Sequence, residues 1–314
     1  MKIAVEFPSV VYREGPEGAA RLARAIEDIG YDQLDVFDHV VMGHPTDGRP
    51  AGPYPPKMPI LEALVTLAYC AAVTRRIGLG TEVLVLPQRH PTLVAKQIAT
   101  LDTLSGGRVR LGVGVGWQES EYDALGVDFH ERGARMDEAI ALLRRYWTED
   151  PVDAAGPHYP MKAIAMEPKP PQGGRLPIWI GGASPAALRR AGRLGDGWLA
   201  VRAAADLEQA RRDIAAVKRH AEEAGRDPES IGFQSQAAPP PRSDDQSAKR
   251  FWAEPAAVAA VAAELRDAGF GWVAVNATGM FQAGARSLDA LIDALGAHHD
   301  AIRREVGASR REVG

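Results

Sequence analysis

The strongest constraint on the fold is an alternation of short apolar runs and helical patterns that repeats eight times along the chain. The apolar runs predict strands at residues 3–7, 33–38, 77–86, 109–115, 177–180, 197–201, 231–237 and 272–277. Helical patterns follow them over 15–29, 59–74, 91–104, 132–147, 185–194, 207–221, 255–268 and 288–302. Eight βα units predict an α/β fold, one (β/α)8 TIM barrel with insertion loops that spans residues 1–314 as a single domain.

Composition narrows the class of protein. The chain has 314 residues, 46% of them hydrophobic, and a net charge of −4 without a basic run that interleaves with aromatic residues. We therefore expect no nucleic-acid partner and no membrane partner. The first residues read as a strand rather than a signal peptide, and the single cysteine, Cys70, lies in an apolar helical run. A cytoplasmic location and a buried, unreactive thiol are the expectations.

Three segments are longer than ordinary connections: 41–57, 148–175 and 239–250. The first and third follow strands 2 and 7, at the carboxyl ends where barrel enzymes build their sites. Each could be a lid over such a site or a plain surface loop.

The ends of the second and third strands carry candidate residues. Strand 2 ends in Phe37-Asp38-His39, an acid and an imidazole that together can bind a heterocycle and move a proton. In strand 3, two glycines and the pair Thr81-Glu82 interrupt a β-branched run, which predicts a bulge.

Strand 4 ends in Gly112, Gly114 and Gly116, followed by Trp117. Residues two apart in a strand share a face, so one face there lacks side chains. This predicts either space for a flat ring at the barrel mouth or close packing of a helix.

Strand 5 leads into Gly181-Gly182-Ala183-Ser184-Pro185, in which Ser184 is a good N-cap and the glycines expose N–H groups to an anion such as phosphate. The eight histidines show no spacing typical of a metal site, so we expect no metal. Glu119 and Glu121 could act as acid and base, but their pattern favours solvated helix positions.

Taken in order, these segments resemble the bacterial-luciferase-like oxidoreductases. The resemblance rests on Phe37-Asp38-His39, Gly80-Thr81-Glu82-Val83, Gly112-x-Gly-x-Gly-Trp117 with Glu121-Tyr122, Arg132-Gly133-x-Arg135-x-Asp137-Glu138, Gly181-Gly182-x-Ser184 and Gly195-Asp196-Gly197-Trp198. It implies a barrel that binds FMN or the deazaflavin coenzyme F420, and it is closest to the F420-dependent branch.

The resemblance also assigns residues. It implies that Asp38 contacts the deazaflavin and that His39 is catalytic, donating a proton. A bulge at Glu82-Val83, often with a cis peptide in this family, would back the ring. Gly181, Gly182 and Ser184 would hold the phosphate, with Gly114, Gly116 and Ser120 as further cofactor contacts.

One position departs from the family pattern. Relatives that oxidise a sugar phosphate place a glutamate where this chain has Trp117. Trp117 is then expected in an apolar substrate wall or in buried packing, and the acid/base partner of His39 is unassigned.

The resulting hypothesis is hydride transfer between F420 and a small organic substrate. The alternatives are an FMN monooxygenase fed by a separate flavin reductase, a flavin- or deazaflavin-binding protein without turnover and, more distantly, a barrel hydrolase or aldolase. Relatives often form homodimers, which makes a homodimer an expectation as well.

Overall fold

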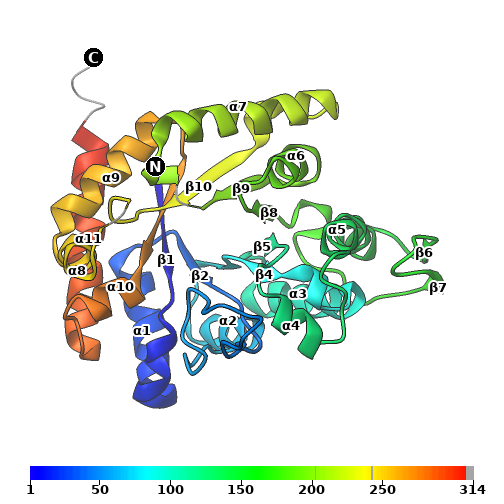
Figure 1. The fold of residues 1–314 in the computed structure, drawn as a ribbon. Helices are drawn as coiled ribbons and strands as arrows, with labels where there is room; N and C mark the ends of the chain where they lie inside the picture. The colour runs from blue at the N-terminus through cyan, green and yellow to red at the C-terminus, as the bar shows by residue number, and fades with distance from the viewer. Residues whose placement is uncertain (202, 242, 309–314) are drawn as a thin grey trace.

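The structure is a computed structural model that describes residues 1–201, 203–241 and 243–308. Its main sheet is parallel throughout (Figure 1). Its strands are β1 (Lys2–Glu6), β2 (Gln33–Val36), β3 (Gly78–Thr81), β4 (Leu84–Val85), β5 (Val109–Gly114), β8 (Ile178–Gly181), β9 (Gly197–Ala200), β10 (Gly232–Gln236) and β11 (Trp272–Asn276). Because β3 pairs with both β2 and β5, the sheet closes into a barrel. Counting β3 and β4 as one interrupted strand, the described residues form the eight-stranded barrel that the sequence predicted.

An outer ring of helices covers the barrel. It consists of α1 (Gly15–Ile29), α2 (Ala63–Val73), α3 (Pro91–Ser105), α5 (Arg132–Thr148), α6 (Pro185–Leu194), α7 (Leu207–Glu223), α9 (Pro255–Asp267) and α11 (Leu288–Ala308). Local chemistry fixes several ends: α1 and α3 stop at Gly30 and Gly106, both left-handed, and Ser184 caps α6 before Pro185.

Shorter elements decorate this frame. They are the helices α4 (Glu119–Ala124), α8 (Asp245–Ala253) and α10 (Ala277–Gln282), the antiparallel strands β6 (Val152–Ala154) and β7 (Met161–Ile164), and the 3-10 turns at Ser9–Glu14, Leu86–Gln88, Gly173–Arg175, Ala203–Ala205 and Pro228–Ser230. The long segment 148–175 thus contains a hairpin that projects from the side of the barrel (Figure 1). The segment 239–250 is not a plain loop, because α8 begins within it.

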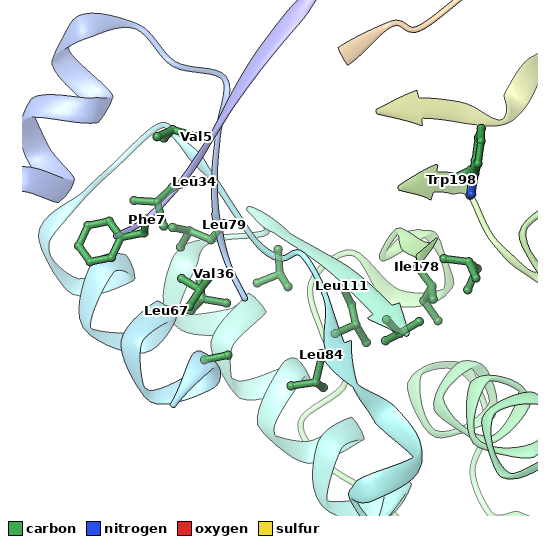
Figure 2. Packing of buried hydrophobic residues seen from close by; sticks show 14 of the residues in the cluster. Val5, Phe7, Leu34, Val36, Leu67, Leu79, Leu84, Leu111, Ile178 and Trp198 are labelled. Atoms are coloured by element: carbon green, nitrogen blue, oxygen red, sulfur yellow. The ribbon is translucent and has the colours of Figure 1, made fainter. Parts of the chain in front are cut away.

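The apolar core lies between the strands and the helices. Side chains such as Val5, Leu34, Leu79 and Leu111 alternate along their strands and face the outer ring (Figure 2). Cys70 of α2 is buried in this layer as expected, and burial raises the pKa of its thiol to about 12. No helix within the described ranges is both long and apolar enough to cross a membrane.

The inside of the barrel is polar. The guanidinium of Arg110 of β5 lies over the rings of Trp179 and Trp272, 4.5 and 4.8 Å from their centroids, and donates to Asp35 of β2 at 2.6 Å. Gln33 and Gln234 donate to the same aspartate. This buried layer forms the base on which the mouth of the barrel rests.

Candidate active site at the mouth of the barrel

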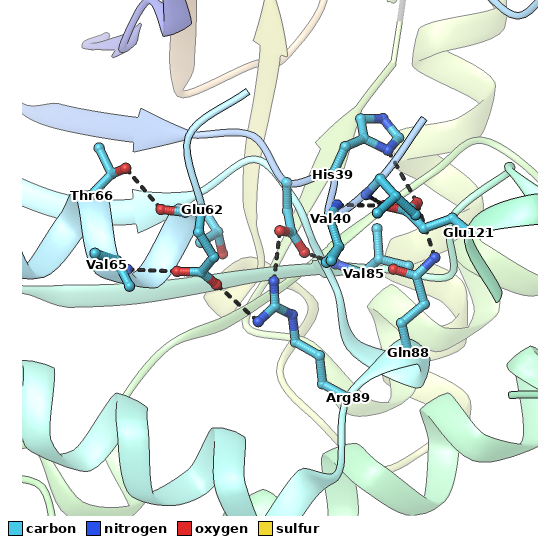
Figure 3. Close-up of polar contacts among 12 residues, drawn as sticks. His39, Val40, Glu62, Val65, Thr66, Val85, Gln88, Arg89 and Glu121 are labelled. Atoms are coloured by element: carbon cyan, nitrogen blue, oxygen red, sulfur yellow. Dashed lines mark hydrogen bonds and ion pairs between the residues drawn. The ribbon is translucent and has the colours of Figure 1, made fainter. Parts of the chain in front are cut away.

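His39 lies just past the end of β2, is buried, and pairs with Glu121 of α4 (Figure 3). The imidazole Nδ1 is 3.2 Å from Oε2 of Glu121. An ionised carboxylate only accepts hydrogen bonds, so Nδ1 carries the proton and Nε2 is left as the nitrogen that can exchange one. The geometry is that of an oriented acid/base histidine.

Glu121 is held from several sides. The amides of Val40 and Val41 donate to its Oε1, at 2.5 and 3.3 Å, and Gln88 donates to Oε2 at 3.0 Å. Burial on its own would raise the pKa of this carboxyl, but the hydrogen bonds from His39, Gln88 and Val40 outweigh burial and lower it. Glu121 is therefore an ionised anchor for His39.

This pairing corrects the expectation that Glu119 and Glu121 are both solvated. Glu119 is exposed, whereas Glu121 is only 1% exposed and faces the barrel mouth. Residues two apart lie on nearly opposite sides of a helix, so one of the pair had to turn inward once α4 packed there. The sequence left the partner of His39 unassigned, and the structure shows that Glu121 is the carboxylate that pairs with it.

Asp38 has a different role from the one expected. Its Oδ1 accepts from Arg89 at 2.8 Å and its Oδ2 from the amide of Val85 at 3.1 Å (Figure 3). Arg89 also pairs with Glu62, the N-cap of α2. With both oxygens engaged and the side chain fully buried, Asp38 fastens the loop ends together, and a direct contact with a cofactor does not fit this geometry.

The interruption of strand 3 is confirmed. The Glu82–Val83 peptide is cis and separates β3 from β4. Val83 contacts the strand surface of β5 and β8, because a Cβ added at Gly114 or Gly181 would lie only 2.6 or 2.8 Å from its methyl groups. The 82–83 bulge thus projects at the mouth, where the resemblance expects the cofactor ring.

One expectation was that the glycines of strand 4 leave open space, and it is wrong. A Cβ at Gly112 would meet the carbonyl oxygen of Thr81 at 1.9 Å, and one at Gly116 would meet Val85 at 2.7 Å. With Gly114 against Val83, the glycine row lets the interrupted third strand approach β5 closely. These glycines shape the site by positioning the bulge.

The segment before α6 has the form of an anion site. Gly182 has a φ of +113°, and Ala183 and Ser184 are exposed at the start of the helix. The Ser184 hydroxyl accepts from the amide of Ala187 at 3.2 Å and can still donate outward. Gly181 instead belongs to the packing around Val83. Residues 182–184 therefore fit a phosphate group.

Ser120 offers a second polar atom for a cofactor. Its hydroxyl is buried and has no hydrogen-bond partner among the described residues. A Cβ at Gly43 would lie 2.3 Å from that oxygen, so the segment after β2 covers it closely. An unpartnered buried hydroxyl beside His39's anchor fits the contact that the resemblance assigns to Ser120.

An aromatic wall surrounds His39. Trp117 and Tyr54 each place their ring centroids 5.5 Å from the imidazole, and Phe37 stacks on Tyr54 at 6.1 Å. Trp117 is 45% exposed, which excludes the buried-packing alternative. The segment 41–57 folds back over this wall, since a Cβ at Gly52 would lie 3.1 Å from the Trp117 ring.

Comparison with known proteins decides the family. The family model described as luciferase-like monooxygenase matches residues 3–306. The chain belongs to this family. An uncharacterized protein of Mycobacterium tuberculosis is 39% identical over 213 residues, covering 65% of this chain and 72% of that one.

Two further similarities come from named enzymes. The F420-dependent glucose-6-phosphate dehydrogenase of Gordonia bronchialis is 35% identical over 265 residues, covering 80% of this chain and 73% of that one. The oxygenating constituent of 3,6-diketocamphane monooxygenase from Pseudomonas putida, solved with FMN, shares the fold with a TM-score of 0.73 at 15% identity, covering 98% of both chains. The luciferase-like barrel is thus common to deazaflavin and flavin enzymes.

Proposed function

We propose that the chain is an oxidoreductase that exchanges a hydride between coenzyme F420 and a small organic substrate. The observation that carries this proposal is the buried His39–Glu121 pair at the end of β2, with the rings of Trp117 and Tyr54 next to the imidazole. Relatives at 31–35% identity that are named F420-dependent support the choice of coenzyme.

The residues present fit such a coenzyme. The 82–83 bulge would back its ring, residues 182–184 would bind its phosphate and the buried Ser120 hydroxyl would meet a polar edge. F420 supplies a ring carbon that accepts or gives a hydride. Asp38 keeps the bulge and the end of β2 in register through Val85 and Arg89.

The chain's own contribution is proton handling and exclusion of water. Nε2 of His39 takes or delivers the proton that accompanies hydride transfer. Glu121 stabilises the imidazolium form and fixes the ring, because its ionised carboxylate accepts from Nδ1. Trp117 and Tyr54 shield the reacting atoms and supply apolar surface for the substrate.

Cofactor titration tests the choice of coenzyme. Purified protein should quench F420 fluorescence saturably with a dissociation constant of about 10 μM or below, while FMN should bind about tenfold more weakly. Tight FMN binding with oxygen consumption in the presence of a flavin reductase would instead favour the monooxygenase alternative. Binding of neither cofactor would overturn the proposal.

The pairing of His39 with Glu121 disfavours the alternative of a cofactor-binding protein without turnover. That alternative rested on Trp117 replacing an acid of the family, whereas Glu121 supplies a carboxylate to the same histidine from α4. Tight F420 binding with no reduction by a broad substrate panel would revive it.

A further inference from the structure

A cavity lies at the mouth, next to the aromatic wall. Its volume is about 370 Å³, and its polar lining comes from Glu6 of β1, Gln236 of β10 and Asn276 of β11, with Thr278 and Gln282 of α10. Phe37 and Tyr54 line it as well and contact His39 at centroid distances of 6.4 and 5.5 Å. The cavity is therefore continuous with the wall around the catalytic histidine and has room for a small organic molecule.

Glu6 is the ionisable centre of this cavity. The amide of Gln236 donates to its Oε2 at 2.7 Å, and the amide of Asn276 donates to its Oε1 at 3.3 Å. Both partners are neutral, so neither compensates a negative charge as an arginine would. The carboxyl is fixed in position and partly open to the cavity.

The charges below Glu6 favour its protonated form. Two more carboxyls lie near Glu6, those of Asp35 of β2 and Glu82 of the bulge. Among the described residues, Arg110 is the cation that interacts with these two acids. Arg110 donates to Asp35, and Gln234 bridges Asp35 and Glu82 at 3.3 and 2.9 Å. Three acids around one arginine hold a proton more firmly than a paired acid does.

Burial, opposed by the hydrogen bond from Gln236 and reinforced by the charge of Asp35, raises the pKa of Glu6 to about 7. The same causes raise the pKa of Glu82, by burial first and then by repulsion from Asp35 and Glu6. Near neutrality Glu6 therefore has an O–H to donate, which an ordinary glutamate lacks.

We propose that this cavity receives the oxygen-bearing end of an uncharged substrate, a ketone or an alcohol, and that Glu6 as a carboxylic acid donates a hydrogen bond to that oxygen. The proposal rests on the proposed function and names its substrate class. A carboxylate or phosphate in the same place would find no lysine or arginine among the described residues that line the cavity, and the ionised fraction of Glu6 would repel it. Glu6 acts here as a specificity residue of the substrate cavity.

Binding of matched probes tests the proposal without turnover. Saturation-transfer NMR would follow cyclohexanone and cyclohexanecarboxylate, which share a ring but differ in charge, in the presence of F420. Cyclohexanone can only accept a hydrogen bond, so its affinity should fall about tenfold from about pH 6 to about pH 9 as Glu6 loses its proton. Cyclohexanecarboxylate should bind at least about tenfold more weakly than the ketone at about pH 6.

Two variants distinguish the effect of the Glu6 proton from the effect of the side chain's shape in the cavity. Glu6→Gln keeps a donor at every pH, so it should bind cyclohexanone with little pH dependence; Glu6→Ala should bind it about tenfold more weakly than wild type at low pH. Glu17→Gln, an exposed change on α1, should behave as wild type. Equal affinity for the carboxylate, or the same pH dependence in Glu6→Gln, would overturn the proposal. Loss of F420 quenching would refute the proposed function instead, whereas F420 binding without ketone binding would refute only this inference.

Discussion

Two glutamates on opposite sides of the barrel mouth, Glu121 and Glu6, have pKa values that are shifted in opposite directions. On the β2–β5 side, Asp38 is paired with Arg89 and Glu121 collects donors from His39, Gln88 and two amides. On the β1–β10–β11 side, Glu6 has only amide partners and stands above further acids. The hydrogen bonds on one side keep Glu121 ionised, and the surroundings on the other side let Glu6 hold its proton to a higher pH than an ordinary glutamate does. The same residue type thus has two protonation behaviours at one barrel mouth, because the surroundings differ.

The largest effect is expected from removing the imidazole of His39, on the β2–β5 side of the mouth. His39→Ala should lower turnover about 10³-fold, because the group that moves the proton is lost, and leave the F420 dissociation constant within about twofold. Steady-state kinetics and fluorescence titration measure the two quantities. Unchanged turnover would remove His39 from the mechanism.

Glu121→Gln tests whether turnover depends on the ionised carboxylate that pairs with His39. Turnover should fall about 10²-fold, since the amide neither stabilises the imidazolium nor fixes the same tautomer. Glu119→Gln, two residues away and exposed, is the matched control and should retain wild-type rates. If both variants were equally active, the contact with His39 would be only structural.

Glu121→Gln should also change how the free energy of unfolding depends on pH. The pKa of Glu121 is lowered in the folded state, so its stabilisation is present above its unfolded value of 4.5 and is lost as the pH falls through the folded pKa. Wild type should therefore lose more unfolding free energy on acidification than Glu121→Gln, as denaturant titrations can measure. Parallel acid profiles for the two proteins would contradict this.

Arg89→Met tests the reassignment of Asp38 to a structural role. It leaves the buried Asp38 carboxyl without its cation, so the free energy of unfolding should fall by about 3–5 kcal/mol. In the double variant with Asp38→Asn, part of that loss should be regained and F420 affinity should remain near wild type. A large loss of F420 affinity in Asp38→Asn alone would restore the cofactor contact.

The smallest effect should come from Glu6→Gln, with the opposite pH trend from that of Glu121. The folded-state pKa of Glu6, about 7, exceeds its unfolded value of 4.5, so the folded wild-type protein binds more protons in this window and loses stability as the pH rises through it. Glu6→Gln removes that penalty and should gain about 3 kcal/mol over wild type on going from the acid to the alkaline side of this window. Thermal or urea unfolding at both ends of the window checks the sign, and a gain toward acid would be contrary to the account.

The sequence predicted the barrel well because a short stretch of residues is enough to indicate each strand and each helix of a βα unit. Strand and helix patterns with caps such as Ser184 and Gly30 placed the elements near their observed bounds, and the break at Glu82–Val83 followed from its odd composition. The glycine row of strand 4 was visible, but only the fold shows that Val83 and its neighbours fill the space beside it.

The site was harder to predict because its contacts join distant parts of the chain. Glu121 and His39 are 82 residues apart, and α4 carries too few turns to display an inward face in its sequence. Glu6 was the next-to-last residue of an ordinary predicted strand, over residues 3–7. A usable signal was present: polar residues at alternate positions near the ends of several strands, such as Asp35, Gln234 and Gln236, indicate a polar barrel interior.

Anaerobic reduction of F420 by the wild type and Glu121→Gln, with a panel of uncharged secondary alcohols as hydride donors, tests the central claim most directly. The account predicts that wild type bleaches F420 with at least one alcohol, and that Glu121→Gln does so about 10²-fold more slowly at an unchanged F420 dissociation constant. Equal rates for the two proteins, or no bleaching by wild type with any alcohol despite tight F420 binding, would contradict it.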